Sequence, residues 1–412
     1  MSDSVPVIHI SPMGNLGNHA IQFMAAMALA ARVGPVRYSA VGLNLFGIEH
    51  KPIEGTFPAT EIVTVQTIPR DRLAAALCDG KLARVDIRAY AQRMENFLPA
   101  AAYRDVLRVP DPEPQPIAPH ELLCNVRQGD ILDGHHPDYV LIPIDFYADL
   151  IAETGLAPVF LGQLEESPYL AALRARFPDA RFLPSRGPAC DFASICQASN
   201  IVPAISTFSW LAAFVSCADR IFFPVLGLFN PAQNRAVDLL PFEDPRYRFY
   251  QFPVHYATNV QNFARSHASL RGLWRHLPAS RLRDMLSATP PPREKSHYLE
   301  AFDEIFYQAA HPDVAAAIAA GHMLSFRHHY ETCGFTEGRA AFALDRAWYC
   351  REYPIAALEI AAGEYWDPDH HWLEAGRVRG YRRGLPSPTQ RTTDQIPQTP
   401  APPAGTVQYP GR

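Results

Sequence analysis

The chain has 412 residues, of which 48% are hydrophobic and 19% are charged. A chain of this length predicts two or three compact units, and its apolar fraction excludes a wholly disordered protein. The 37 basic and 42 acidic residues give a formal net charge of -5, so the chain offers no positive field to phosphate backbones and nucleic-acid binding is not expected.

The cysteines and the apolar runs bear on the cellular compartment. Seven cysteines without a CxxC pair predict reduced, mostly buried thiols. The apolar run 20–31 is too short to span a bilayer, and Asp219 and Arg220 interrupt the more hydrophobic run 204–229. We therefore expect a soluble cytoplasmic protein, with association at the inner face of a membrane left open as an alternative.

The first 118 residues begin with a predicted βαβ unit. A strand-like run at 5–11 leads through a turn into an apolar, helix-like run from Ala20, and 35–41 resembles a second strand. Five of the ten residues from Pro110 to Pro119 are proline, which predicts a stiff, extended hinge. We expect residues 1–118 to form an N-terminal α/β half that ends in this hinge.

The next segment, residues 119–256, alternates strands with helices of about ten residues. The strand-like runs lie at 122–127, 158–162, 180–184, 200–205 and 220–227. Such alternation favours a parallel sheet covered on both faces. The predicted fold class is therefore α/β, with two Rossmann-type α/β halves and a cleft between them, as in proteins that bind nucleotides.

The last third of the chain is predicted to be helical. Residues 257–295 are expected to form a helical segment and a proline-rich linker. Beyond them, 302–339 aligns without gaps to 344–381, a repeat with a period of 42 residues. Each unit is expected to contain two short helices with glycine breaks, so 296–385 form a small α-helical repeat region. The proline-rich tail 386–412 has no apolar period and is predicted to be disordered.

The turn from Gly14 to Asn18 joins the first strand to the first helix. It departs from the dinucleotide pattern GxGxxG, so binding of NAD is not predicted. Gly14 and Gly17 permit a close backbone approach, and the amides at the start of the helix favour an anion or a sugar hydroxyl. The alternative is an ordinary strand-to-helix turn in which Asn18 caps the helix.

The segment Asn125–Asp130 places an arginine at the end of a strand. Alternation puts Asn125 and Arg127 on one face, with Arg127 at the carboxyl end, where open α/β sheets bind ligands. A guanidinium there can donate two hydrogen bonds to a diphosphate, each contributing roughly 1.5–3 kcal/mol. Gly129 allows a tight turn, and Asp130 could hold the arginine or accept a substrate hydroxyl. The alternative is a surface arginine paired with Asp130.

The segment Ser206–Trp210 begins a helix directly after the predicted strand 200–205. Ser206 or Thr207 is expected to cap this helix and to direct hydroxyls and free amides across the end of the sheet. Phe208 and Trp210 are expected to pack in the core, which leaves the hydroxyls free for a ligand. The alternative is a capped core helix without a binding role.

Taken together, these segments resemble the α-1,2-fucosyltransferase family and its wider GDP-fucose-dependent relatives. The family opening G-x-L-G-N-Q is matched by Gly14, Leu16, Gly17 and Asn18, with His19 in place of Gln. Its HxRRGD motif is matched by Arg127, Gly129 and Asp130, with Asn125 for His and Gln128 for the second Arg.

Two further segments extend this resemblance, which runs in order from about residue 8 to 231. The family's P-x-D-[YF]-Y segment is matched by Pro143–Tyr147, and its N-S-[ST]-F-S-W-W segment by Ser206–Trp210 with Leu211 for the last Trp. The resemblance implies a GT-B-like pair of α/β domains, with the acceptor on the side of residues 1–118 and the nucleotide sugar on 119–256.

The resemblance also implies an activity. It implies a bacterial, inverting glycosyltransferase that transfers fucose from GDP-fucose to a glycan hydroxyl during surface-polysaccharide assembly, with no cofactor and no metal. Arg127 and helix-end amides would stabilise the leaving diphosphate, and Arg127 and Asp130 would be the catalytic residues. The donor-binding residues implied are Gly14, Gly17, Asn18, Asn125, Arg127, Glu165, Ser206, Thr207, Phe208 and Ser209.

One feature of the family is missing from this chain. Relatives carry an acidic turn thought to face the guanosine, and here LGQLEES at 161–167 stands in that place, so Glu165 or Glu166 is a substitute. The acceptor hydroxyl needs a base within about 3 Å, and Asp130, Glu165, Glu166 and His19 are all candidates. Two alternatives stay open: a transferase with a different nucleotide sugar, and a glycan- or nucleotide-binding protein that has lost catalysis.

Paired histidines occur at 135–136, 328–329 and 370–371. Adjacent side chains on regular elements diverge and no third ligand recurs at a useful spacing, so no metal site is predicted. The DxD-like string 367–369 lies inside the second repeat and is expected to be a turn. The repeats resemble short modules appended to bacterial polysaccharide enzymes and surface proteins, a likeness that implies no activity.

Overall fold

The structure is a computed structural model that describes residues 5–134, 136–257 and 262–384. The chain divides into two compact units, one holding the chain up to Pro291 together with Cys350–Pro368, the other holding Pro292–Tyr349 and the residues from Asp369. His135 and the tail predicted to be disordered lie outside the described residues. Among the described helices, none combines the length and the apolar character that a bilayer span requires.

The N-terminal part of the first unit is a four-stranded parallel sheet in the order β2-β1-β6-β5. Its strands are β1 (Val7–Ile10), β2 (Arg37–Ser39), β5 (Thr60–Val63) and β6 (Arg84–Ile87). Helix α1 (Leu16–Val33) joins β1 to β2, which pair in parallel, so the predicted βαβ opening is confirmed. Most residues of α1 are buried, because its apolar run packs against the sheet and against α2 (Arg70–Cys78).

Short elements complete this part of the chain. They are β3 (Val41–Leu43), η1 (Asn44–Phe46), β4 (Ile48–His50), η2 (Met94–Asn96) and α3 (Ala101–Arg104). Strands β3 and β4 form an antiparallel hairpin beside α1. The proline-rich segment 110–119 then leads to the second sheet, where Gln115 donates from its backbone to the Ser194 hydroxyl.

The second sheet has seven strands in the order β13-β12-β11-β10-β7-β8-β9. Its strands are β7 (Glu121–Val126), β8 (Ala157–Gly162), β9 (Arg181–Pro184), β10 (Asn200–Val202), β11 (Arg220–Val225), β12 (Tyr247–Gln251) and β13 (Arg275–Leu277). All neighbours are parallel except β12 and β13. The predicted α/β class, with two Rossmann-type halves, is therefore confirmed by the strand order of this chain.

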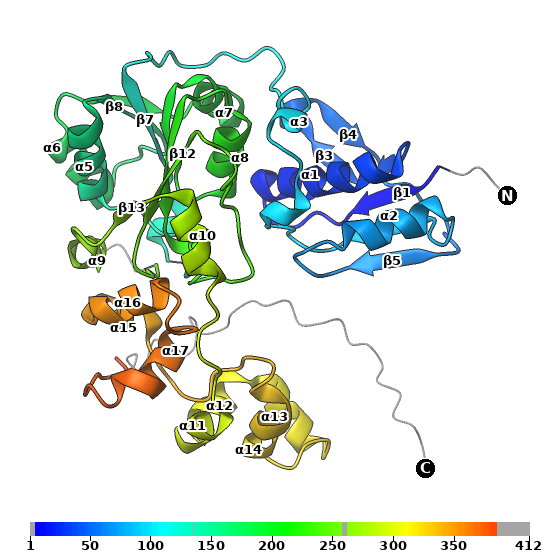
Figure 1. The fold of residues 1–412 in the computed structure, drawn as a ribbon, viewed down its shortest axis with the longest axis vertical. Helices are drawn as coiled ribbons and strands as arrows, with labels where there is room; N and C mark the ends of the chain where they lie inside the picture. Colours follow the sequence, from blue (N-terminus) through cyan, green and yellow to red (C-terminus); the bar gives the residue numbers. More distant parts are fainter. Residues whose placement is uncertain (1–4, 135, 258–261, 385–412) are drawn as a thin grey trace. The chain divides into compact units, whose positions relative to one another are not determined.

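Helices cover the second sheet on both faces, as predicted. The connecting helices are α4 (Gly129–Leu132), α5 (Ile144–Thr154), α6 (Pro168–Arg176), α7 (Pro188–Gln197) and α8 (Thr207–Val215), and the 3-10 turn η3 (Gly227–Phe229) follows β11. Figure 1 shows α5 and α6 on one side of the sheet and α7 and α8 on the other. The chain moves from β7 outward to β9, then returns to β10 and continues the other way, so the direction of winding reverses between β7 and β10.

The helical segment predicted at 257–295 contains two helices, but it also contains a strand that was not predicted. Two helices, α9 (Phe263–Leu270) and α10 (Ala279–Ser287), flank strand β13, which pairs antiparallel with β12. Gly272, at a φ of +70°, and Pro278 bracket these residues, so a helix cannot run through them. A three-residue strand leaves no period-two signal, which is why the pattern missed it.

The repeats give the same series of elements twice. The first contains α12 (Glu304–Ala310), α13 (Pro312–Ala319), α14 (Phe326–His329) and the π-helical turn η5 (Tyr330–Gly334); the second contains α15 (Arg346–Glu352), α16 (Pro354–Ala361), α17 (Pro368–His371) and η6 (Trp372–Gly376). A short helix, α11 (Lys295–Glu300), precedes them. The DxD-like string reaches into α17, so the predicted turn is wrong for Pro368 and Asp369.

One buried contact recurs in both repeats. Tyr307 bonds through its hydroxyl to Nδ1 of His329 at 3.0 Å, and Tyr349 bonds to Nδ1 of His371 at 2.8 Å. A glycine lies against each hydroxyl, and a Cβ on Gly334 would come within 2.3 Å of the Tyr307 oxygen. The second histidine of each aligned pair is therefore part of the internal packing of its repeat.

Candidate functional site

The carboxyl ends of β7 and β10 meet where the second sheet reverses its winding. The two strands are neighbours, with Leu123 opposite Ile201 and Cys124 opposite Val202. The segments that follow the two strands, one toward Arg127 and the other toward Ser206, therefore leave the sheet side by side. Open α/β sheets bind their ligands at such a reversal, because the connections on either side diverge and leave room between them.

Arg127 is held in place by two neighbours. Its Nε and Nη2 donate to the two carboxylate oxygens of Asp130 at 3.2 and 2.6 Å, and its guanidinium carbon lies 4.7 Å from the centre of the Tyr139 ring. The arginine side chain is 21% exposed and that of Asp130 57%. Burial raises the pKa of Tyr139, and the nearby positive charge of Arg127 opposes that rise. Asp130 thus holds the arginine, one of the two roles that the sequence left open.

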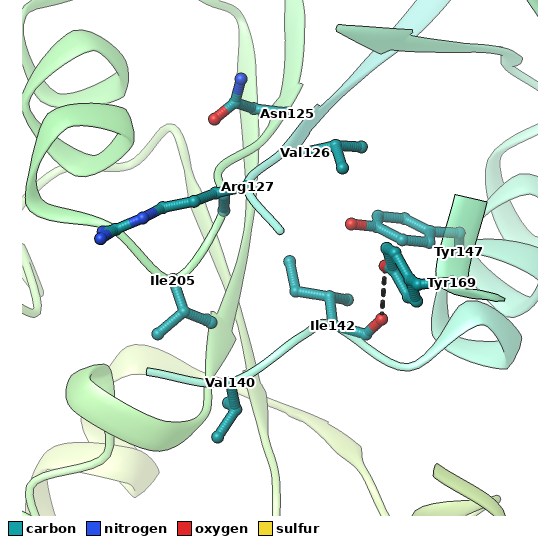
Figure 2. Close-up of a pocket in the computed structure, with 9 residues that line it drawn as sticks. Asn125, Val126, Arg127, Val140, Ile142, Tyr147, Tyr169 and Ile205 are labelled. Carbon is teal, nitrogen blue, oxygen red and sulfur yellow. Dashed lines mark hydrogen bonds between the residues drawn. The ribbon is translucent and has the colours of Figure 1, made fainter. Parts of the chain in front are cut away.

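A small cavity lies behind this arginine. It measures about 10 Å³, room for about one water molecule, and the ends of both strands line it, including Arg127 and Ile205. Figure 2 shows the Arg127 side chain pointing away from the two tyrosines, Tyr147 and Tyr169, that close the opposite wall. The cavity is too small for a nucleotide.

The loop after β7 is fixed by Gln163. Its Oε1 accepts from the backbone N–H groups of Gln128 and Gly129, each at 3.0 Å. The Gln128 side chain is buried, donates to the carbonyl of Glu165 at 2.6 Å and accepts from the Ser167 hydroxyl at 2.5 Å. Gln128, which stands where the HxRRGD motif has its second arginine, therefore links two loops instead of presenting a charge.

Asn125 is also engaged within the sheet. Its Nδ2 donates to the carbonyl of Leu161 at 3.0 Å, and its side chain is buried. Gly162 follows at a φ of +130°, and a Cβ there would lie 2.3 Å from the Val126 carbonyl oxygen. This close approach explains the glycine. The bond from Asn125 to Leu161 uses one of the two N–H donors of its side chain, so the amide oxygen and the second N–H are not engaged by it.

The two acidic residues proposed as substitutes for the missing turn lie on the surface. Glu165 is exposed and contributes its backbone carbonyl to Gln128. Glu166 is exposed as well and pairs with Arg174 at 2.6 Å. Glu166, unlike Glu165, is thus engaged in an ion pair among the described residues.

The turn from Gly14 brings the N-terminal half to the same region. Helix α1 begins at Leu16 with Asn15 in the cap position, so the alternative in which Asn18 caps the helix is wrong. The side-chain oxygen of Asn18 accepts from Gln92 at 2.9 Å. Gly14 adopts a φ of +71°, which favours glycine.

Gly17 marks the contact between the glycine-containing turn Gly14–Asn18 and the hydroxyl-containing segment Ser206–Trp210. A Cβ at this position would lie 2.6 Å from the backbone nitrogen of Phe208 and 2.7 Å from the Thr207 hydroxyl. The N-termini of α1 and α8 therefore meet, and only glycine permits it. Each N-terminus carries free backbone N–H groups and a partial positive charge, so their meeting favours an anion nearby.

The start of α8 keeps the hydroxyls of Ser206 and Thr207 near this contact. Ser206 occupies the cap position but its side chain makes no capping bond, contrary to the expectation. Ser209 is used internally, since its hydroxyl accepts from the backbone N–H of Ala204 at 2.9 Å. Phe208 packs on Phe192, and Trp210 is fully buried, as predicted for these aromatic residues.

A larger cavity lies beside α1. It measures about 200 Å³ and is lined by Ile10, Pro12, His19, Ala40, Val41, Gly42 and Leu43. His19 is its only titratable lining residue in the described chain. Ala40 has a φ of +61°, an uncommon conformation for a residue other than glycine.

The two α/β halves are joined by further contacts near these segments. Arg93 and Asp238 form a parallel bridge, with the Met94 N–H donating to the Asp238 carbonyl at 2.8 Å. The Trp210 ring of the second half lies 5.9 Å from the Phe97 ring of the first, measured between ring centres, and its indole N–H donates within the second half to the Leu239 carbonyl at 2.7 Å. The residues that sequence reasoning missed are Gln92, Tyr139 and Gln163, each of which holds a predicted site residue by a contact distant in sequence.

Comparisons with known proteins add little to this picture. No family model matches the sequence, and no curated protein matches it. Among solved structures, the ADP-heptose lps heptosyltransferase II of E. coli is similar over 60% of this chain and 90% of that chain, with 13% identity and a TM-score of 0.30. A superposition with this TM-score has no bearing on the function of this chain.

Proposed function

We propose that the chain is an inverting, metal-independent glycosyltransferase that transfers fucose from GDP-fucose to a hydroxyl of a surface glycan. The observation that carries this proposal is the meeting of three segments: Arg127 at the end of β7, and the N-termini of α1 and α8 in contact at Gly17. The resemblance of these same segments to the fucosyltransferase motifs supplies the choice of donor.

The reaction needs a countercharge for its leaving group. The acceptor oxygen attacks C1 of the sugar, the bond from C1 to the β-phosphate oxygen breaks, and GDP departs with the electron pair. Asp130 uses two of the five N–H donors of Arg127, so three are left for the diphosphate. Amides at the start of α8 add dipolar stabilisation, which serves in place of a metal ion.

The proton of the acceptor hydroxyl needs a base. Of the four candidates, Asp130 is engaged by Arg127, Glu166 is paired with Arg174, and Glu165 is exposed on the surface. His19 lines the cavity of about 200 Å³ beside the start of α1. We assign the acceptor to this cavity and the base to His19.

The test removes the guanidinium. Arg127→Ala should lower kcat/KM for transfer from GDP-fucose by two or more orders of magnitude, in line with the loss of a preorganised donor to developing charge. Arg72→Ala is the matched control, because Arg72 pairs with Glu61 on the surface of the N-terminal sheet. Near-normal turnover by Arg127→Ala would overturn the proposal.

The alternatives predict different binding and hydrolysis. The motif substitution Gln128, which is buried and neutral where the motif has an arginine, motivates the alternative of a binding protein without catalysis. Tight GDP binding with neither donor hydrolysis nor transfer supports that alternative. Calorimetric titration with GDP, UDP and CMP distinguishes a transferase that uses another nucleotide sugar.

A further inference from the structure

We propose that the first repeat binds a zinc ion through His329, Cys333 and Glu337. A ring nitrogen of His329, the sulfur of Cys333 and a carboxylate oxygen of Glu337 all lie within 4.8 Å of one another. His329 ends α14, Cys333 lies in the π-helical turn η5, and Glu337 lies in the turn that follows, so three successive short segments supply the three ligand atoms. Imidazole, thiolate and carboxylate are the ligands that Zn²⁺ takes in proteins, and three of them leave one position for water.

The histidine is already oriented as a ligand would be. Its Nδ1 bonds to the Tyr307 hydroxyl at 3.0 Å, and the residue is only 8% exposed. In the tautomer whose Nδ1–H donates to the Tyr307 oxygen, this bond holds the ring and Nε2 keeps its lone pair for a metal. Within the described chain, the side chain of His329 has no other hydrogen-bond partner.

The local charges also balance around a divalent ion. Arg339 donates to both oxygens of Asp313 at 3.0 and 2.8 Å and to one oxygen of Glu337 at 2.6 Å. Asp313 therefore compensates the arginine. A thiolate at Cys333 and the carboxylate of Glu337 then supply the two negative charges that match Zn²⁺, and binding would release the thiol proton.

The second repeat shows that these ligands are not needed for folding. It keeps the tyrosine–histidine bond between Tyr349 and His371, but alanine and arginine stand where the first repeat has Cys333 and Glu337, at Ala375 and Arg379. The π-helical turn also occurs in both repeats. The thiol and the carboxylate are thus additions to a frame that forms without them.

The experiment measures zinc binding to the full chain after removal of metal by a chelator. Competition with a chromophoric chelator should give one tightly bound Zn²⁺ per chain, and Co²⁺ should produce a thiolate-to-metal absorption band. Cys333→Ala should weaken binding at least 100-fold and abolish the band. Cys78→Ala is the control, since Cys78 is an exposed thiol on α2.

A gain-of-function variant makes the test independent of any loss of folding. Ala375→Cys with Arg379→Glu should raise the stoichiometry from one to two, because His371 already holds the corresponding position. Absence of a stoichiometric zinc in the unchanged chain would overturn the proposal. Equal affinity in Cys333→Ala would do the same, because it would place the ion on other histidines.

Discussion

Replacing Gly17 by alanine tests whether the N-termini of α1 and α8 meet as described. The added Cβ would lie 2.6 Å from the Phe208 nitrogen and 2.8 Å from the carbonyl carbon of Thr207, so backbone must move to admit it. Overpacking of this kind costs about 1–3 kcal/mol. Alanine in a helix regains about 0.5–1 kcal/mol relative to glycine, so we expect a net loss of about 1–2 kcal/mol.

Urea unfolding of the full chain measures this loss. Gly42→Ala is the matched control, since a Cβ on Gly42 meets nothing within 4 Å and its backbone lies outside the left-handed region. That variant should be within about 0.5 kcal/mol of the unchanged protein. If the glycosyltransferase proposal holds, Gly17→Ala should also weaken GDP binding by about tenfold. A Gly17→Ala protein as stable as the control would refute the close contact.

Three further predictions concern stability. Gln163→Ala should lower the free energy of unfolding by about 1–3 kcal/mol, because two loop N–H groups lose their acceptor. Gln163→Glu keeps an oxygen at that position and should recover most of this loss. Burial lowers the pKa of His255 to about 3 and of His267 to about 4, while the unfolded chain binds protons below about 6.5. Unfolding free energy should therefore fall as pH drops from 6.5 toward 4, by up to about 1.4 kcal/mol per pH unit for each histidine, and a flat profile between pH 7 and 5 would contradict this. Trp210→Phe should lower the free energy of unfolding by about 1–3 kcal/mol, because the buried Leu239 carbonyl loses its hydrogen-bond donor. Equal urea midpoints for the variant and the unchanged protein would disprove that role.

The elements that the sequence pattern predicted are those with long apolar runs. The first helix and the alternating strands of the second sheet are buried along most of their length, so their periods are visible. Strands β5 and β6 were missed because they are four residues long and carry polar or charged residues, as in Arg84–Ile87. Strand order could not be read at all, since it depends on which way each connection crosses the sheet.

The candidate site shows the same division between local and distant information. Arg127 at a strand end and Gly17 at a helix start follow from local pattern. The partners that hold them, such as Gln163 and Tyr139, could not be deduced, because hydrogen bonds across 34 residues and ring contacts across twelve leave no periodic signal. The spacing of four from His329 to Cys333 and Glu337 is present in the sequence, but spacing alone does not show that the three side chains converge.

The ion pair between Arg127 and Asp130 would compete with the diphosphate of the proposed donor, and the free energies of the two interactions can be compared. Asp130 is 57% exposed, and exposed ion pairs contribute about 0–1 kcal/mol. Charge-assisted hydrogen bonds from the same guanidinium to a diphosphate contribute about 1.5–3 kcal/mol each. Even complete replacement of Asp130 by the diphosphate would therefore be favourable. The Tyr139 ring beneath the guanidinium limits its rotation, so binding of the diphosphate that the proposed function requires would cost less conformational entropy. The pair is thus better understood as positioning the arginine for a second anion than as neutralising it.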